Sequence, residues 1–177
     1  MEAAQIEQLI SGAITPGNFA WADLGSGAGA FTLALRKLGG PEIKIYSVDS
    51  QISKLREQEE LFCTNFPGAN IKFIEQDFTV DLSLPILDGI LMANSLHFVR
   101  RKNQFLDSIT QFLKPGGKLL IVEYDTDRGN SFVPYPLTFY RLSKLLRQHD
   151  FSDPELLATA PSKYEKGMYS AVATWLE

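Results

Sequence analysis

The chain has 177 residues, of which 45% are hydrophobic, and its formal net charge at pH 7 is −4. This length and apolar content suit one domain with a sizeable core, and the mildly acidic charge weighs against a nucleic-acid partner. No apolar run is long enough to span a membrane, and the first residues lack the basic and apolar regions of a signal peptide. We therefore expect no membrane partner and a cytoplasmic location.

The single cysteine, Cys63, excludes an internal disulfide and a multi-cysteine zinc site. We expect no metal site in this chain. We expect Cys63 to pack in the interior, on the helix before the third strand, and a reactive thiol is the alternative.

The first predicted element is a short amphipathic helix over residues 2–11, because Ile6, Leu9 and Ile10 recur at helical spacing. An apolar run over 19–21 then predicts the first strand.

Residues 21–29, Trp-Ala-Asp-Leu-Gly-Ser-Gly-Ala-Gly, join this strand to a helical pattern over 31–38. Glycine adopts positive φ easily and has no Cβ, so three glycines at alternate positions let the backbone turn sharply and touch a ligand. A strand, a glycine turn and a helix N-terminus together predict a nucleotide-like binding site, with a tight turn that binds nothing as the alternative.

Two signatures fit this loop. Residues 25–30 satisfy the dinucleotide fingerprint G-x-G-x-x-G/A, and residues 23–29 satisfy D-x-G-x-G-x-G. A carboxylate beside a pyrophosphate would repel it, whereas a carboxylate beside an ammonium group attracts it. Asp23 therefore weighs against a pyrophosphate at this position.

The next two strands are predicted over 43–48 and 71–76, and an acid follows each of them. Asp49 comes about 20 residues after the glycines, where an acid accepts hydrogen bonds from ribose hydroxyls. NAD enzymes share this feature, and an N-cap for the helix predicted over 50–62 is an alternative role for Asp49. Asp77 follows the third strand, and a solvated strand end is the alternative there.

The second half of the chain continues the alternation of strands and helices. The predicted elements are a strand over 87–93, a helix over 102–113, a turn over 113–117, a strand over 118–124, a loop over 125–136, a helix over 137–148 and strands over 154–159 and 168–176. Asp150, in the turn after the last helix, is expected to adopt the left-handed conformation that a short polar side chain tolerates.

In their order and spacing, these motifs resemble those of the class I S-adenosylmethionine-dependent methyltransferases, in particular the small single-domain bacterial type. The resemblance covers residues 19–125 and includes the Leu-Lys-Pro-Gly-Gly turn over 113–117. It implies S-adenosylmethionine as cofactor, with Asp23 near the methionine amino group, Asp49 at the ribose and Asp77 at the adenine amino group. The implied cofactor-binding residues are Asp23, Gly25, Ser26, Gly27, Gly29, Asp49, Ser50, Asp77, Phe78 and Asn94.

The resemblance also implies an α/β fold: a Rossmann-like three-layer sandwich with a mostly parallel seven-stranded sheet and an antiparallel last strand. The near-continuously apolar strands agree, because strands of a parallel sheet are buried on both faces. We expect one domain over 1–177, in which residues 1–18 form an N-terminal helix that covers the cofactor. Residues 19–125 form the cofactor-binding core, and residues 126–177 form a loop, a helix and a C-terminal hairpin.

His97 follows the strand at 87–93, which in this family faces the transferable methyl group. It is a candidate catalytic base for a hydroxyl or acidic acceptor. A structural histidine bonded to the backbone is the alternative, and the more common one. Amine and DNA-base methyltransferases often carry Asn/Asp-Pro-Pro-aromatic here, and only Asn94 matches, which weighs against nucleic-base N-methylation.

Tyr135, Tyr164 and Tyr169 are candidate contacts to a small-molecule acceptor. Tyr135 lies in the loop after the fifth strand, which must reach the crevice at the carboxyl ends of the strands; core packing under the loop is the alternative. Two other functions stay open: a non-catalytic S-adenosylmethionine-binding module or partner-dependent subunit, and a nicotinamide-dependent oxidoreductase, which Asp23 and Asp77 argue against. The oligomeric state is left open.

Overall fold

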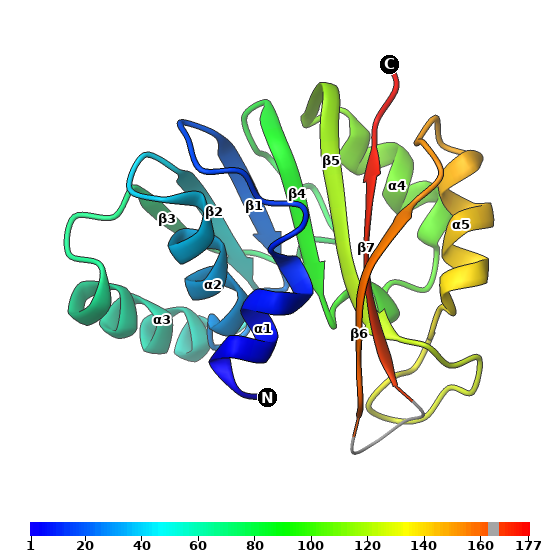
Figure 1. Cartoon of the computed structure of the whole chain (residues 1–177), viewed down its shortest axis with the longest axis horizontal. Coiled ribbons are helices and arrows are strands. Elements are labelled where there is room, and N and C mark those ends of the chain that lie inside the picture. Colours follow the sequence, from blue (N-terminus) through cyan, green and yellow to red (C-terminus); the bar gives the residue numbers. More distant parts are fainter. Residues whose placement is uncertain (163–166) are drawn as a thin grey trace.

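The computed structural model describes residues 1–162 and 167–177. Its centre is a seven-stranded sheet with the strand order β3-β2-β1-β4-β5-β7-β6 (Figure 1). The strands are β1 (Ala20–Leu24), β2 (Lys44–Asp49), β3 (Ile71–Glu75), β4 (Leu87–Ala93), β5 (Leu113–Tyr124), β6 (Glu155–Ala160) and β7 (Met168–Thr174). Strands β1 to β5 pair in parallel, and β7 runs antiparallel to both β5 and β6. The predicted mostly parallel sheet with an antiparallel last strand is confirmed.

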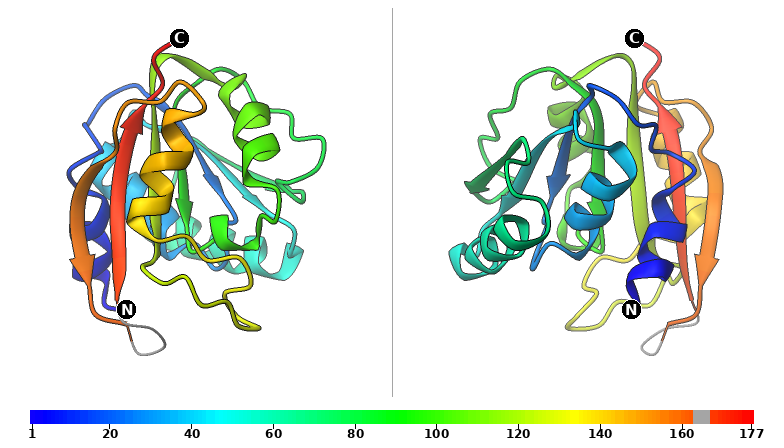
Figure 2. Two further views of the ribbon diagram at one scale, coloured as in Figure 1. Left: turned by 90° about the vertical axis from the view of Figure 1, so that its right-hand side faces the viewer. Right: turned by 60° about the vertical axis from the view of Figure 1, so that its left-hand side comes forward.

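Helices cover both faces of this sheet. They are α1 (Ala3–Ile10), α2 (Ala30–Gly39), α3 (Ile52–Asn65), α4 (Lys102–Thr110) and α5 (Phe139–Arg147), with a short 3₁₀ turn, η1 (Leu96–Phe98). α1 and α2 pack on one face and α4 and α5 on the other, each pair within its own apolar cluster (Figure 2, left). This is the predicted three-layer sandwich. None of the helices in the described ranges is long and apolar enough to cross a membrane.

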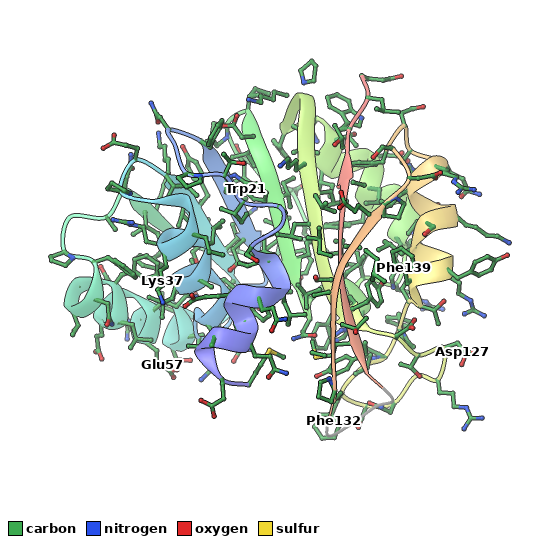
Figure 3. All side chains as sticks on the ribbon, viewed as in Figure 1. Trp21, Lys37, Glu57, Asp127, Phe132 and Phe139 are labelled. Atoms are coloured by element: carbon green, nitrogen blue, oxygen red, sulfur yellow. The ribbon has the colours of Figure 1, made fainter. Side chains whose placement is uncertain are left out.

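The carboxyl ends of the parallel strands meet at one edge of the sheet, at the bottom of Figure 1. Parallel strands end at a common edge, so the loops that follow β1, β2, β3 and β4 are brought together there. The segment between β5 and α5 lies below this edge, where Figure 3 labels Asp127 and Phe132. We call residues 125–138 the lid segment.

Two boundaries differ from the expectation because the Leu113–Gly117 turn joins the sheet. β5 begins at Leu113, which pairs with Leu87, whereas Gly89 pairs with Lys118. The turn is therefore a bulge inside β5, and the preceding helix ends at Thr110. Asp150 has φ +58°, as predicted for the turn after α5.

The structure corrects the expectation for Cys63. The buried side of α3 carries Leu55, Gln58 and Phe62, which are three and four residues apart. Cys63 comes one position later, about 100° around the helix from Phe62 and so off the buried side, and it is exposed.

The N-terminal helix also has a different place from the one expected. Ile6, Leu9 and Ile10 of α1 pack against α2 and the sheet, next to β6. No residue of α1 lines the cleft described below. This helix therefore covers the sheet, because its apolar stripe is needed to close the core on that face.

Candidate active site

The glycine loop between β1 and α2 has the geometry that its sequence predicts. Gly25, Gly27 and Gly29 have φ of +76°, +55° and +85°. The N–H groups of Gly25 and Ser26 both donate to Val48 O, at 2.8 and 3.1 Å, and so attach the loop to the end of β2. A Cβ on Gly29 would lie 2.4 Å from Gln58 Cγ, so this position needs glycine for space as well as for conformation.

Gln58 holds the glycine loop in place, a role that was not predicted from the sequence. Its side chain is fully buried; Nε2 donates to Ser26 Oγ at 2.8 Å and to Gly27 O at 2.6 Å. Its Oε1 accepts from Ser47 Oγ at 2.8 Å. A glutamine on the apolar stripe of the helix predicted over 50–62 was the available signal, because a buried amide needs hydrogen-bond partners.

Asp49 connects the loop to the next helix. Its Oδ2 accepts from Gly27 N–H at 2.8 Å and its Oδ1 accepts from Gln51 N–H at 2.8 Å. The N-cap residue of α3 is Gln51, so the alternative N-cap role for Asp49 is wrong. Each carboxylate oxygen can accept a further hydrogen bond, which leaves Asp49 able to bind a ligand as well.

Asp23 lies in the core beneath the loop, with 1% of its surface exposed. Its Oδ2 accepts from Thr32 Oγ1 at 2.6 Å, and its Oδ1 is buried with no hydrogen-bond partner in the described part of the chain. Burial raises the pKa of Asp23 from its ordinary value of 3.8 to about 7; the Thr32 hydrogen bond opposes this shift and the Asp49 carboxylate adds to it.

A cleft of about 340 Å³ opens at the carboxyl edge of the sheet. It is lined by Gly25, Asp49, Ser50, Gln51, Asp77, Phe78, Thr79, Asn94, Ser95 and Phe98. Six of the ten predicted cofactor-binding residues are among these. The other four, Asp23, Ser26, Gly27 and Gly29, form the loop and the layer beneath it.

Asp77 and Phe78 form one wall of the cleft. Asp77 is exposed, and its Oδ1 accepts from the N–H and the hydroxyl of Thr79, at 2.8 and 2.7 Å. The Phe78 ring packs edge-on against Phe105, with 5.7 Å between ring centroids. These two hydrogen bonds close a turn over residues 77–79 and give Asp77 a structural role. The other carboxylate oxygen, Oδ2, can accept hydrogen bonds from other groups.

The end of β4 supplies the opposite wall. Asn94 has φ +54°, donates its N–H to Val122 O at 2.8 Å, and has a buried Oδ1 with no partner among the described residues. Ser95 is buried and donates its hydroxyl to Leu24 O at 2.6 Å. The strands β1 and β4 are thus joined by a side chain at their carboxyl ends.

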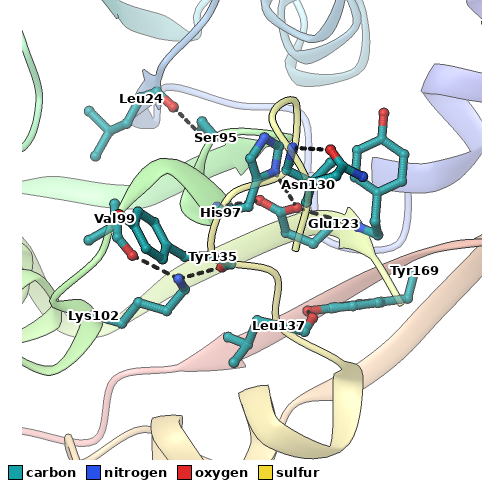
Figure 4. Close-up of polar contacts among 12 residues, drawn as sticks. Leu24, Ser95, His97, Val99, Lys102, Glu123, Asn130, Tyr135, Leu137 and Tyr169 are labelled. Carbon is teal, nitrogen blue, oxygen red and sulfur yellow. Dashed lines mark hydrogen bonds and ion pairs between the residues drawn. The ribbon is translucent and has the colours of Figure 1, made fainter. Parts of the chain in front are cut away.

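His97 is paired with a buried carboxylate (Figure 4). Its Nδ1 lies 2.8 Å from Glu123 Oε2, its N–H donates to Oε1 at 3.0 Å, and the two side chains are 3% and 1% exposed. The alternative role for His97 was a structural histidine whose ring bonds the backbone. The ring instead bonds the Glu123 carboxylate. The sequence analysis missed Glu123, although an acid within the buried strand predicted over 118–124 requires a partner.

The three candidate acceptor contacts have different outcomes. Tyr135 donates its N–H to His97 O at 3.0 Å and keeps its ring 40% exposed. Tyr169 is 1% exposed and donates its hydroxyl to Leu137 O at 2.8 Å, so it is a core residue. Its place in β7, with both faces of the strand covered, explains the difference. Tyr164 lies outside the described residues.

Comparison with known proteins agrees with this architecture. A family model described as a methyltransferase domain matches residues 18–164. The ubiquinone/menaquinone biosynthesis C-methyltransferase UbiE of Azotobacter vinelandii is 28% identical over 144 residues, which cover 77% of this chain and 56% of that protein. UbiE of Hahella chejuensis is 29% identical over 106 residues, covering 58% and 41%. The chain spans about half the length of the curated relatives it matches.

Solved structures share the fold at low sequence identity. A SAM-dependent methyltransferase from Aquifex aeolicus superposes with a TM-score of 0.72 at 17% identity, covering 99% of this chain and 100% of that one. The magnesium protoporphyrin IX methyltransferase of Synechocystis, with bound SAM, gives a TM-score of 0.70 at 14% identity, covering 97% and 76%. The chain therefore belongs to the methyltransferase-domain family, in the S-adenosylmethionine-dependent class I.

Proposed function

We propose that this domain methylates a small molecule that gives up a proton from an oxygen or carbon atom, with His97 as the proton acceptor. The observation that carries the proposal is the buried pair of His97 and Glu123. His97 does not itself line the cleft, but it lies in the chain between Ser95 and Phe98, which do. Because the chain belongs to the S-adenosylmethionine-dependent methyltransferases, the methyl donor is S-adenosylmethionine. Relatives named as C-methyltransferases are consistent with an acceptor that loses a proton.

The residues of the cleft and of the layer beneath the glycine loop fit S-adenosylmethionine. Two buried oxygens, Asp23 Oδ1 and Asn94 Oδ1, have no partner in the described part of the chain, and an unsatisfied buried acceptor calls for a donor such as an ammonium group. Asp49 has remaining acceptor capacity for ribose hydroxyls, and Asp77 Oδ2 for the adenine amino group. Phe78 offers an apolar face to a flat ring.

When bound, the cofactor supplies a methyl carbon made electrophilic by its sulfonium charge. The chain then has to align the acceptor, exclude water and take up a proton. With Glu123 ionised, Nδ1 of His97 carries the hydrogen it donates, which leaves Nε2 as the atom that accepts a proton. Glu123 also binds the His97 N–H, so it fixes both the ring and the backbone of this residue.

Binding and turnover test the proposal separately. Calorimetry is expected to show micromolar-range binding of S-adenosylhomocysteine and no binding of NADH; tighter binding of NADH would overturn the choice of cofactor. Release of S-adenosylhomocysteine with phenolic, carboxylic and enolisable acceptors tests turnover. Binding without turnover of any acceptor or metabolite extract would favour a non-catalytic module.

Asp49→Ala is the first variant to measure. It removes a charged acceptor and is expected to weaken S-adenosylhomocysteine binding by roughly 2 to 3 kcal/mol. Thermal stability is expected to fall too, because the Gly27 and Gln51 amides lose their acceptor. Asp77→Asn keeps an acceptor oxygen and serves as the milder control. Unchanged binding by Asp49→Ala would contradict the ribose role.

A further inference from the structure

Lys102 is a half-buried cation at an unfavourable place. It is the first residue of α4, where the helix dipole disfavours a positive charge. Burial lowers the pKa of its ammonium to about 8, and the negative charge of Glu123 opposes the shift. Burial and the helix dipole both disfavour the positive charge of this lysine, so the ammonium group needs hydrogen-bond acceptors that stabilise it.

The contacts of Lys102 join two segments that are far apart in the sequence (Figure 4). Its Nζ donates to Val99 O at 2.8 Å, just after η1, and to Tyr135 O at 2.7 Å, in the lid segment. The Tyr135 ring is also within cation–π range, with 5.8 Å from Nζ to the ring centroid. The ammonium therefore bridges the 3₁₀ turn and the lid segment.

The same lid residue is bonded to His97 from its other side. Tyr135 N–H donates to His97 O at 3.0 Å, while its C=O accepts from Lys102. The backbone of His97 is thus held at its N–H by Glu123 and at its C=O by Tyr135. Without Lys102, the lid segment would be attached at this point by one neutral hydrogen bond.

We infer that Lys102 is a positioning residue for methyl transfer, which clamps the lid segment at Tyr135 onto the turn that carries His97. The clamp keeps the lid closed over this turn and fixes the His97 backbone, so that the ring can meet the acceptor in one orientation. This role rests on the proposed function of His97. It assigns Lys102 to handling of the acceptor and gives it no part in cofactor binding, since no atom of Lys102 lines the cleft.

Three variants separate the clamp from general effects of charge. Lys102→Met keeps the apolar stem and removes the donors, Lys102→Arg keeps a cation with several donors, and Arg101→Met removes the exposed neighbouring charge. Cofactor affinity is measured by calorimetry with S-adenosylhomocysteine. Acceptor kinetics are measured with whichever phenolic, carboxylic or enolisable compound the wild-type protein methylates.

The expected result is specific to the acceptor side. Lys102→Met is expected to lower kcat/KM for the acceptor by about tenfold, since hydrogen bonds from a charged donor are lost, while S-adenosylhomocysteine affinity stays within about twofold. Lys102→Arg is expected to recover most of this loss, and Arg101→Met to behave as wild type. Equal losses in kcat/KM and cofactor affinity, or an Arg101→Met effect as large as that of Lys102→Met, would overturn the role.

Amide hydrogen exchange tests the clamp without any turnover. In Lys102→Met, the Tyr135 amide is expected to exchange about tenfold faster, while the Asn94 amide, bonded to Val122 O, keeps its wild-type rate. An unchanged Tyr135 rate would refute the clamp even if the protein is an active methyltransferase. A faster rate in a protein that lacks turnover would instead uphold the clamp and count against the proposed function.

Discussion

The cleft proposed for the cofactor is built differently from the region proposed for the acceptor, which we call the acceptor side and which consists of η1 and the lid segment. Around the cleft, the loop is shaped by three glycines at positive φ, and it is held by two main-chain hydrogen bonds to Val48 O and by the side chains of Gln58 and Asp49. On the acceptor side, the 3₁₀ turn and the lid segment are held by charged side chains, Glu123 and Lys102. Backbone geometry is therefore the sensitive element of one region and side-chain charge that of the other, so single substitutions are expected to affect one region without the other.

The largest effect is expected from a glycine substitution that distorts the backbone of the loop beside the cleft. Gly29→Ala places a Cβ 2.4 Å from Gln58 Cγ at φ +85°, and strain plus overpacking is expected to cost roughly 3 kcal/mol and to abolish cofactor binding. Gly68→Ala is the matched control, because Gly68 has φ +80° and open space around its Cβ position. It is expected to cost only about 1 kcal/mol, with normal binding. Denaturant unfolding and calorimetry check both variants, and equal losses would contradict the steric role of Gln58.

The second largest effect is expected from removing a charged side chain on the acceptor side. Glu123→Gln removes the ionised partner of His97 and is expected to lower kcat at least about 100-fold, the usual contribution of a positioned base. Cofactor affinity is expected to stay unchanged, because Glu123 does not line the cleft. Steady-state kinetics and calorimetry measure the two quantities. A kcat close to that of wild type would leave His97 with a structural role only.

A pH experiment sharpens the comparison on the cofactor side. Asp23 is protonated below its pKa of about 7 in the free protein, whereas the unfolded chain ionises it above its ordinary value of 3.8. The stability contributed by the protonated form is therefore lost as pH rises from about 4 to 7, and no further loss is expected above 7.

We propose that the cofactor's ammonium group binds at Asp23, where its positive charge favours the ionised carboxylate, so binding is expected to release a proton below pH 7. Affinity then rises toward pH 7, by at most about tenfold per pH unit. Calorimetry at pH 6 in buffers of different ionisation enthalpy counts the protons. In Asp23→Asn, the rise of cofactor affinity with pH is expected to vanish. If affinity still rose with pH in this variant, the titrating group would be a different one.

The smallest expected effect tests the core role of Tyr169. Tyr169→Phe leaves the Leu137 carbonyl without its phenol donor and is expected to lower the free energy of unfolding by about 1 kcal/mol. Acceptor kinetics and cofactor binding are expected to match the wild type. A raised acceptor KM with unchanged stability would restore the acceptor contact that the sequence suggested.

Much of the fold could be predicted because its signals are local. The strand at 87–93 has the observed bounds of β4, and the αL conformation of Asp150 follows from its place after a helix. Errors occur where two segments meet: the turn at 113–117 became a bulge because Leu113 pairs with Leu87. The exposed face of α3, and with it Cys63, depends on which side of the helix meets the sheet.

The sequence by itself determined the glycine loop and the strand-end acids of the proposed cofactor cleft. Three glycines between a strand and a helix, and acids directly after the next two strands, are read from neighbouring residues, and parallel strands bring them to one edge. The tertiary structure alone decided which residues pair on the acceptor side. Glu123 lies 26 residues from His97, and Tyr135 lies 33 residues from Lys102, so neither pair leaves a local pattern. Such pairs form only because the core excludes water and each buried charge must find a partner in whatever segment the fold places beside it.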